Sequence, residues 1–371
     1  MKLIYRSITQ DFISKLFKGK VVIIYGPRQT GKTTLVKHVC EKYPNYKYIN
    51  CDEPQNAERL SPRSASQLHE FLGVINLVVL DEAQKVKDIG LSLKILVDTY
   101  PGLQLIVTGS SAFDLENRLA EPLTGRHYDF MMLPPSYEEL EKTSVAQELE
   151  QRLLYGSYPE VVLPKIGDTS EERIKSIASD YTMKDILAFE GIRKSSTIEK
   201  LLKVLAYQMS NEISFREISE NFGMSVQTIQ NYIEILEKAF IVFLLEPYGG
   251  NPRVALRRKK KIYFYDTGLR NALINNFDSL DIRPDKGALF ENYIISEFYK
   301  KNLNHGDGKN LFFYRSYQGE EIDLLTMKGG ELLGYECKYK YDQDIIKKST
   351  NSPIVTVKVI TKNNFPQFLN S

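Results

Sequence analysis

A short glycine-containing segment near the N-terminus has the residue types needed to bind phosphate groups. It reads Gly26-Pro27-Arg28-Gln29-Thr30-Gly31-Lys32-Thr33, followed by Thr34, and has the spacing G-x-x-x-x-G-K-[ST]. Backbone N–H groups of such a loop surround phosphate oxygens, and glycine permits the dihedral angles that this requires. We expect Lys32 to reach the β and γ phosphates of ATP and the Thr33 hydroxyl to hold Mg²⁺. A plain glycine-containing turn between a strand and a helix is the alternative.

Two adjacent carboxylates follow the next strongly apolar segment. Leu77 to Leu80 predict a buried strand, and Asp81 and Glu82 come directly after it. A buried strand that ends in two carboxylates is costly unless something at its tip uses them. Asp81 suits the Mg²⁺ shell, and Glu82 suits polarisation of the water that attacks the γ phosphate. An acidic exit from a strand, without chemistry, is the alternative.

A third apolar run, Leu103 to Val107, ends in Thr108, Gly109, Ser110 and Ser111. We predict a strand beside the other two, from which a hydroxyl such as that of Ser110 senses the γ phosphate. Ordinary turn chemistry at the end of a strand explains the same residues. A helix from about Thr33 to Val39 would direct its positive dipole end at the nucleotide.

The length and composition of the chain indicate how many domains to expect and which classes of protein to exclude. At 371 residues two or three domains are expected, and a net charge of +2 identifies no partner. Three scattered cysteines, Cys40, Cys51 and Cys337, predict neither a disulfide framework nor a zinc site. The longest apolar run, Ala239 to Leu245, is too short to cross a bilayer. We therefore expect a cytoplasmic protein without a membrane partner.

The middle of the chain predicts helices and then a helix-turn-helix. Glu148 to Met209 has helical periodicity. Phe215 to Asn221 predicts a short helix, and Ser225 caps a second helix that ends near Lys238. Strands over Ile241 to Leu245 and Lys261 to Tyr265 would form a wing. Between them lies the segment "NPRVALRRKKK", which has six basic residues and no acid: Arg253, Arg257, Arg258, Lys259, Lys260 and Lys261. Such a wing suits phosphate-backbone contacts, whereas a solvated hairpin or a protein-packing module is the alternative.

On these motifs the sequence resembles prokaryotic AAA-type P-loop ATPases with a C-terminal winged-helix and restriction-endonuclease-like region. The motifs are "GPRQTGKT", "LVVLDEAQ", "VTGSSA" and "LTGRHYDFMMLPPS", with "GSYPEVV" and "YTMKDIL" as linkers. The resemblance implies an α/β fold, with a parallel-sheet ATPase domain, a helical connector, a winged helix and a small nuclease-like domain. It also implies ATP and Mg²⁺ as cofactors. Arg126 matches the family's Gly-Arg pair and is either an arginine finger or a partner of a local carboxylate.

The C-terminal region is similar to the restriction-endonuclease-like fold. A helix over Gly287 to Lys301 carries Glu291, and a following hairpin carries Asp323 and the Glu336-x-Lys338 pair. The resemblance implies that Glu291, Asp323 and Glu336 bind a divalent ion. Lys338 would orient or activate the water that attacks a phosphodiester.

The end of the chain departs from this nuclease pattern. After Lys338 we predict only a short helix over Asp342 to Lys348 and a strand over Ile354 to Ile360. Such a shortened half argues against an independent nuclease, even with the metal residues present.

Four domains are therefore expected: the ATPase domain at 1–140, a helical lid or connector at 141–210, a winged helix at 211–275 and a nuclease-like domain at 284–371. The first functional hypothesis is an ATPase that acts on nucleic acid, DNA more than RNA, with an oligomer as a candidate assembly. The second is a nucleotide-driven switch whose C-terminal domains only bind or pack.

Overall fold

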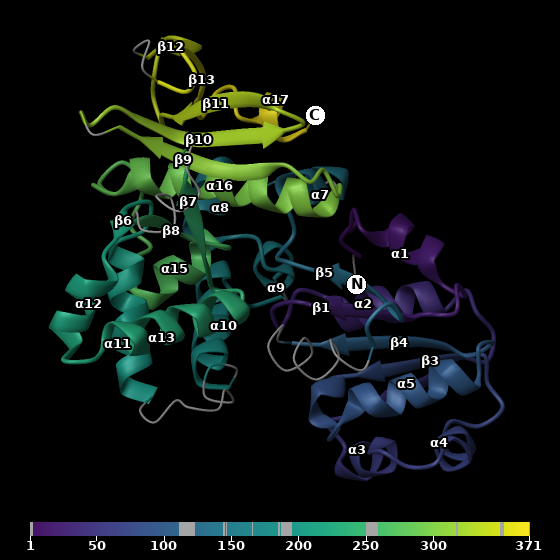
Figure 1. The fold of residues 1–371 in the computed structure, drawn as a ribbon. Coiled ribbons are helices and arrows are strands. Elements are labelled where there is room, and N and C mark those ends of the chain that lie inside the picture. The colour runs from purple at the N-terminus through teal and green to yellow at the C-terminus, as the bar shows by residue number, and fades with distance from the viewer. Residues whose placement is uncertain are drawn as a thin grey trace. The chain divides into compact units, whose positions relative to one another are not determined.

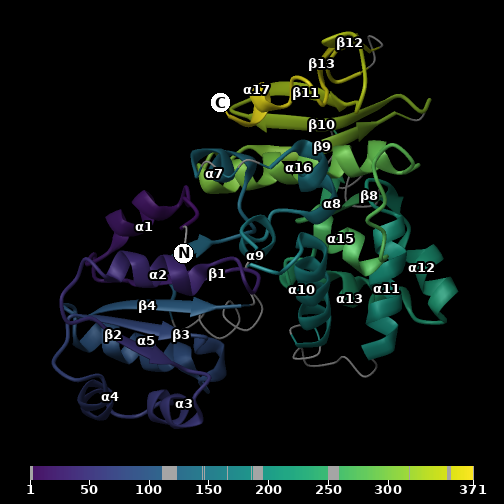
Figure 2. The same cartoon turned by 180° about the vertical axis from the view of Figure 1, so that it is seen from behind.

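The protein is described by a computed structural model and divides into two compact units (Figures 1 and 2). One unit is Arg6–Leu133, and the other joins Met1–Tyr5 to Pro134–Ser371. The structure describes residues 3–110, 123–143, 145, 147–164, 166–184, 186, 195–249, 259–316, 318–348 and 352–370. Within these ranges, no helix is both long and apolar enough to span a bilayer. All three cysteines are buried free thiols.

The first unit contains a five-stranded sheet in which every strand pair is parallel (Figure 1). The strand order is β2-β3-β4-β1-β5. The strands are β1 (Val21–Tyr25), β2 (Lys47–Asn50), β3 (Leu77–Asp81), β4 (Gln104–Gly109) and β5 (His127–Met131). The three predicted apolar runs are therefore strands. Because all strands are parallel, the residues that follow β1, β3 and β4 meet at one edge of the sheet.

Helices cover both faces of this sheet (Figure 2), as alternation of side chains along each strand requires. The helices are α1 (Thr9–Lys15), α2 (Lys32–Cys40), α3 (Pro54–Leu60), α4 (Ala65–Leu72) and α5 (Ile89–Thr99). On one face Val22 and Ile24 pack in a core with Leu35 of α2. On the other face Val21 and Ile23 belong to the core that contains residues of α4 and α5. The sheet is thus buried on both sides.

The second unit begins with helices and continues into a mixed sheet. Its helices are α7 (Tyr137–Lys142), α8 (Leu149–Tyr155), α9 (Pro159–Val162), α10 (Ser170–Lys184), α11 (Ser195–Tyr207), α12 (Phe215–Phe222), α13 (Val226–Lys238), α15 (Thr267–Leu273), α16 (Lys286–Asn304) and α17 (Pro366–Leu369). Helices α12 and α13 form where the sequence predicts them. Gly223 ends α12 with a left-handed φ of 61°, and the Ser225 hydroxyl accepts a hydrogen bond from the Thr228 N–H at the start of α13.

Eight strands of the second unit form one sheet in the order β12-β13-β11-β10-β9-β7-β8-β6. They are β6 (Glu212–Ile213), β7 (Val242–Pro247), β8 (Lys260–Phe264), β9 (Asn310–Arg315), β10 (Glu321–Lys328), β11 (Glu331–Cys337), β12 (Ile345–Lys347) and β13 (Thr356–Ile360). Strands β7 and β9 pair in parallel, at Glu246 with Phe312 and at Pro247 with Phe313. The two predicted wing strands are therefore continuous with the C-terminal sheet.

The predicted helix over Asp342 to Lys348 is wrong, because Ile345–Lys347 forms strand β12 instead. Ile345 pairs antiparallel with Lys358 of β13, and the Lys348 N–H donates to the Val355 carbonyl at 2.7 Å. A helix of two turns is marginal without packing, whereas β13 offers a complete row of backbone partners.

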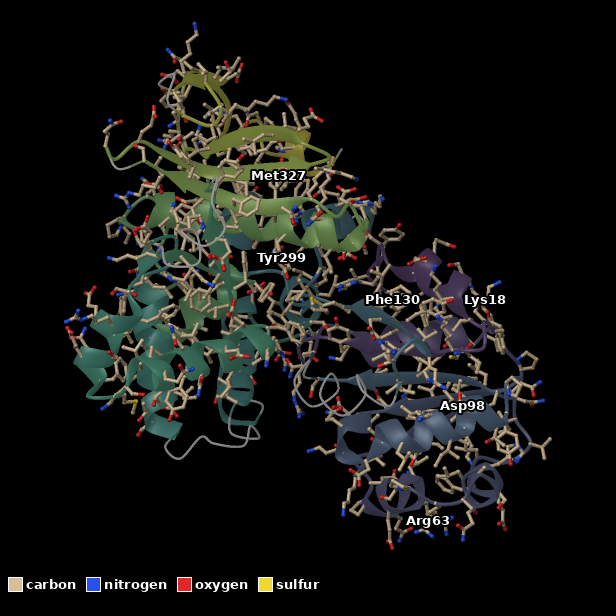
Figure 3. All side chains as sticks on the ribbon, in the orientation of Figure 1. Lys18, Arg63, Asp98, Phe130, Tyr299 and Met327 are labelled. Carbon is tan, nitrogen blue, oxygen red and sulfur yellow. The ribbon has the colours of Figure 1, made fainter. Side chains whose placement is uncertain are left out.

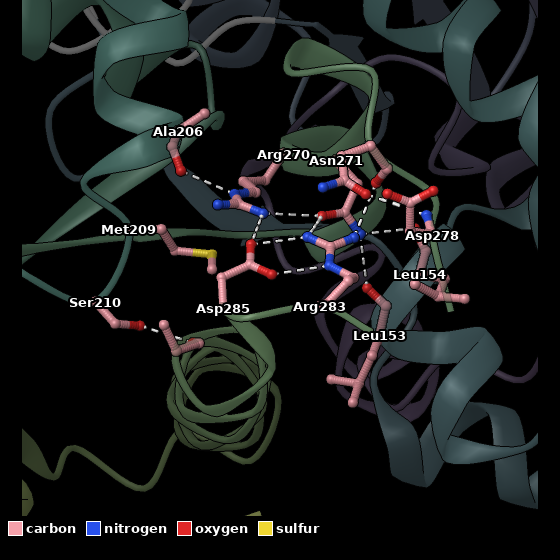
Figure 4. A network of polar contacts seen from close by, with 12 residues as sticks. Leu153, Leu154, Ala206, Met209, Ser210, Arg270, Asn271, Asp278, Arg283 and Asp285 are labelled. Carbon is pink, nitrogen blue, oxygen red and sulfur yellow. Dashed lines mark hydrogen bonds and ion pairs between the residues drawn. The ribbon is translucent and has the colours of Figure 1, made fainter. Parts of the chain in front are cut away.

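Two buried arginines, Arg270 and Arg283, form a hydrogen-bond network that connects helices and loops of the second unit (Figure 4). The Asp285 carboxylate accepts from Arg270 at 2.6 Å and from Arg283 at 2.8 Å. Arg270 also donates to the Ala206 carbonyl at 2.8 Å, and Arg283 donates to the Asn271 side chain at 3.0 Å. Burial alone would raise the pKa of Asp285, but the two guanidinium groups lower it to about 2.

Candidate functional site

The loop after β1 has a backbone conformation that only glycine accepts easily. Gly26 has φ +144°, and a Cβ atom there would lie 2.3 Å from the Met132 carbonyl oxygen. Gly31 has φ +93° and precedes the first residue of α2. Both glycines of the predicted motif are therefore required by the local geometry.

Lys32 folds back over this loop. Its side chain is only 6% exposed, and its Nζ donates to the carbonyl oxygens of Gly26 at 2.8 Å and Pro27 at 2.6 Å. The Thr30 hydroxyl donates to the Pro27 carbonyl at 2.9 Å. The ammonium is thus held at the loop, in a position from which phosphate oxygens could replace the two carbonyls.

The remaining predicted loop residues differ in exposure. Arg28 and Thr33 are partly buried, whereas Gln29 and Thr34 are exposed. Gln29 has a left-handed φ of 59°, which tightens the loop ahead of Gly31. The loop and the first turn of α2 therefore each carry one partly buried and one exposed side chain among these four.

Asp81 lies beside the hydroxyl of Thr33, as the motifs predict. The Thr33 Oγ1 is 3.1 Å and 3.0 Å from the two carboxylate oxygens of Asp81. The hydroxyls of Thr108 and Tyr48 also donate to this carboxylate. A hydroxyl and a carboxylate are oxygen ligands of the type that Mg²⁺ takes. Two motifs that are 48 residues apart therefore meet in one group of potential metal ligands.

Two residues that the sequence did not single out take part in this site. Tyr48 donates to Asp81, and burial, together with that carboxylate, raises the pKa of its phenol. Gln84 donates to the Glu82 carboxylate and, at 3.0 Å, to the Ser110 hydroxyl. Only the position of Gln84, two residues after Glu82, offered a local signal. Through Gln84, the predicted base and the predicted γ-phosphate sensor are connected.

Arg126 lies at the opposite edge of the sheet from the loop. Strand β5 pairs in parallel with β1, with His127 beside Val21 and Met131 beside Tyr25. Arg126 thus precedes the start of β1, whereas the loop follows its end, six residues further along the strand direction and about 20 Å away by the rise of a strand. Its Nε donates at 2.7 Å to Asp98 of α5, the residue labelled in Figure 3. Strand register excludes a role at the loop of its own chain, and a role toward another copy stays a prediction.

The C-terminal acids form the carboxylate cluster, which we define as Glu291, Glu321, Asp323 and Glu336. The Lys261 Nζ lies 2.5 Å from Glu321 and 3.0 Å from Glu291. The Lys338 Nζ lies 3.0 Å from Glu336 and 4.0 Å from Asp323. Lys348 also contacts Glu336. The predicted Glu291, Asp323, Glu336 and Lys338 are therefore close together, but with two further lysines among them.

Burial and charge act differently on the members of this cluster. Burial, together with Glu291 and Glu336, raises the pKa of Asp323 well above its usual range. Burial also raises the pKa of Glu291, against the attraction of Lys261. For Glu336 the hydrogen bonds from Lys348 and Lys338 outweigh burial and lower the pKa.

The predicted metal shell of Glu291, Asp323 and Glu336 does not fit this arrangement. In the described part of the chain, no three His, Cys, Asp or Glu side chains are grouped so that they could hold a metal ion. Each of the three acids has a lysine within 4.0 Å instead. Cys337 is buried, and its N–H donates to Asp323 at 2.8 Å.

Two of the six basic wing residues make internal contacts. Lys261 is 3% exposed and contacts the carboxylate cluster, and Lys260 pairs with Glu246 at 2.5 Å. Lys259 is exposed. Arg253, Arg257 and Arg258 lie outside the described residues. The predicted basic wing therefore loses Lys261 as a phosphate contact, because a buried ammonium among carboxylates cannot reach a solvent-exposed ligand.

Three family models match successive parts of the chain. Residues 18–141 match the model described as AAA domain. Residues 146–280 and 286–353 match two models that are each described as a domain of unknown function, DUF8612 and DUF4143. The matches are collinear and leave few residues between them.

Several relatives that align with most of the chain are named only as uncharacterized proteins. One, from Mycobacterium tuberculosis, is 27% identical over 350 residues, which cover 93% of this chain and 76% of the relative. Another, from Methanocaldococcus jannaschii, is 25% identical over 393 residues and covers 96% and 85%. Among solved structures, the Walker-type ATPase PABY2304 of Pyrococcus abyssi is 15% identical, covers 72% of this chain and 94% of that chain, and has a TM-score of 0.49.

The family match and the parallel sheet together identify the class of the N-terminal segment. A strand, a phosphate-binding loop and a helix in succession, with Asp81 beside Thr33, are the parts of a P-loop nucleotide site. Residues 18–141 therefore have the fold and motifs of a P-loop nucleotide-binding domain, and they match the model described as AAA domain.

Proposed function

We propose that the protein hydrolyses ATP with Mg²⁺ at the loop after β1. The observation that carries this proposal is the contact of the Thr33 hydroxyl with both oxygens of Asp81, 3.1 Å and 3.0 Å away. Thr33 and Asp81 would hold the ion, which neutralises charge on the phosphates. Lys32 would pair with the β and γ phosphates, while the backbone from Gly26 to Thr34 surrounds them.

In this proposal Glu82 orients and polarises the attacking water. It follows Asp81 directly and so emerges at the same sheet edge as the loop. Its backbone N–H donates to Thr108 Oγ1 at 3.3 Å, and Gln84 holds its side chain. In the same proposal Ser110, which accepts a hydrogen bond from the Gln84 amide, senses the γ phosphate.

Replacement of Glu82 by Gln tests the assignment. The amide keeps the size and hydrogen bonds of the side chain but cannot accept the proton of water, so ATP binding should persist while turnover falls by about 100-fold or more. Turnover of radiolabelled ATP and equilibrium ATP binding would be measured on both proteins. Wild-type turnover in the Glu82→Gln variant would exclude Glu82 as the base.

We further propose that the ATPase acts on nucleic acid through helices α12 and α13, with DNA favoured over RNA. Gln227, Gln230 and Asn231 of α13 are exposed polar side chains of the type that contacts bases. Fluorescence anisotropy with labelled DNA and RNA duplexes, with and without ATP, tests this. Binding that falls steeply with salt and weakens in a Gln227→Ala, Gln230→Ala, Asn231→Ala variant would support it.

The alternative is a nucleotide-driven switch whose second unit only packs or binds protein. Burial of Lys261 and the pairing of Lys260 with Glu246 favour this alternative, since both remove charge from the predicted wing. Absence of binding to either nucleic acid, in a protein that turns over ATP, would select the switch.

A further inference from the structure

We propose that Lys261 is the resident cation of the carboxylate cluster and that this cluster does not take up a divalent metal ion. The inference concerns the second unit alone and is independent of ATP hydrolysis. It assigns to Lys261 the place that a metal ion would take between Glu291 and Asp323.

Two elements bring carboxylates to this one ammonium. Lys261 comes from β8, Glu291 from α16, and Glu321 and Asp323 from β10. The Lys261 Nζ lies 2.5 Å from Glu321 Oε1, 3.0 Å from Glu291 Oε1 and 3.9 Å from Asp323 Oδ1. With 3% of its surface exposed, the lysine has no access to bulk solvent as a competing partner. A buried lysine normally needs such partners to remain charged.

The backbone on both sides of Lys261 holds it in place. In the antiparallel ladders it pairs with Leu245 of β7 and with Glu212 of β6. Two residues further, on the same face of β8, the Tyr263 hydroxyl donates to Glu291 Oε1 at 2.8 Å. Lys261 therefore cannot leave the cluster by a local movement of its strand without loss of ladder hydrogen bonds.

A divalent ion and this ammonium compete for the same oxygens. Mg²⁺ and Ca²⁺ require oxygen ligands within about 2.0–2.6 Å. The oxygen of Glu291 that would be offered already accepts from both Lys261 and Tyr263. Those of Glu336 are engaged by Lys338 at 3.0 Å and by Lys348. A dication placed beside the Lys261 ammonium would also be repelled in a buried region, where charges are poorly screened.

The chemical consequence is that the carboxylate cluster and its lysines form a metal-free network of ion pairs. Three lysines, Lys261, Lys338 and Lys348, face the four carboxylates, so most of the negative charge that would attract a metal is compensated internally. This network of ion pairs connects β8, which follows helices α12 and α13, with helix α16 and with strand β10 of the C-terminal sheet. The second unit would then act by binding or packing rather than by metal-dependent phosphodiester cleavage.

Manganese binding to the full-length protein tests this inference. All proteins carry Asp81→Asn, which removes the proposed ion site of the first unit, and contain no nucleotide. Free Mn²⁺ is titrated by electron paramagnetic resonance with the parent, with Lys261→Met, and with Lys260→Met as a matched control. Lys260 is the preceding residue of β8 and pairs with Glu246, outside the carboxylate cluster.

We expect no Mn²⁺ site in the parent or in Lys260→Met below about 1 mM, and one site at least about 100-fold tighter in Lys261→Met. Addition of Asp323→Asn to Lys261→Met should remove that site again. Mn²⁺ binding by the parent that Asp323→Asn abolishes would overturn the inference. A folded Lys261→Met protein without a new site would also overturn it. If circular dichroism shows that Lys261→Met is unfolded, comparison of the parent with its Asp323→Asn variant still decides.

Discussion

Replacement of Lys32 by Met is the most direct test of where the ATP phosphates bind. Met keeps most of the aliphatic volume of this side chain, which is 6% exposed, and removes only the ammonium. In the structure that ammonium donates to the Gly26 and Pro27 carbonyls. We therefore expect the loop to keep its fold and to lose its attraction for phosphate.

The expected loss of ATP affinity can be worked out from the Lys32 ammonium, which exchanges two carbonyl partners for a phosphate when ATP binds. A unit charge about 4 Å from a phosphate charge gains about 4 kcal/mol at an effective dielectric constant of 20. To reach the phosphate, Lys32 gives up the two carbonyl hydrogen bonds, at a net cost of about 1 kcal/mol each. The remaining difference of about 2 kcal/mol corresponds to roughly 30-fold weaker ATP binding.

Isothermal titration with ATP and Mg²⁺ measures this change, and steady-state turnover accompanies it. Lys42→Met is the matched control, because Lys42 is exposed just after the C-terminus of α2. The control should keep wild-type affinity. If Lys32→Met bound ATP within about twofold of wild type and turned it over normally, the phosphates would bind elsewhere and the site assignment would be wrong.

Two further variants test contacts that only the structure revealed. Gln84→Leu removes the donor that holds Glu82, so kcat should fall by about tenfold, the equivalent of one hydrogen bond, while the ATP affinity stays unchanged. Steady-state kinetics checks this, and an unchanged kcat would show that Gln84 does not position Glu82. Asp285→Asn leaves Arg270 and Arg283 buried without their carboxylate and should destabilise the second unit by about 3–5 kcal/mol at pH 7. Because the folded pKa of Asp285 is depressed to about 2, its ionisation contributes stability above about pH 4 that is lost between about pH 4 and 2. Because the Asp285 side chain is 25% exposed, solvent screening reduces this pH-dependent contribution to the free energy of unfolding to about 1–2 kcal/mol. Hydrogen–deuterium exchange of α15 should therefore show a difference between wild type and variant that narrows over this pH range, and a constant difference would contradict the assignment.

The geometry of the proposed ATP site was predictable because its signals are local. Each predicted contact lies within a few residues of the end of a buried strand, and parallel strands bring those ends to one edge. The contact of Thr33 with Asp81 follows from that rule alone. Tyr48 could not be found in this way, because its contact depends on the pairing of β2 with β3, which places Tyr48 beside Val79. No pattern in the sequence around Tyr48 specifies that register.

In the second unit, helices were predicted better than the sheet. Helical periodicity and caps such as Ser225 are properties of a few adjacent residues. The continuity of the sheet depends on the parallel pairing of Glu246 with Phe312, which are 66 positions apart in the chain. The strand at Ile345–Lys347 was missed for the same reason, since its partner β13 supplies the backbone hydrogen bonds that decide its conformation. The predicted domain boundaries at residues 140, 210 and 275 stay predictions.

The proposed role of Lys261 depends on which face of β8 it occupies, and a count of charges along the sequence does not show this. The basic residues before β8 were grouped because no acid interrupts them, yet residues of a strand alternate between its two faces. Lys260 and Lys261 accordingly face different partners, Glu246 for one and the carboxylate cluster for the other. A run of like charges that enters a strand therefore divides between solvent and interior. Whatever attraction the wing has for phosphate must come from the residues before the strand, of which Lys259 is exposed. Substitution of Lys259 should consequently weaken binding to nucleic acid, where binding occurs, without altering the carboxylate cluster.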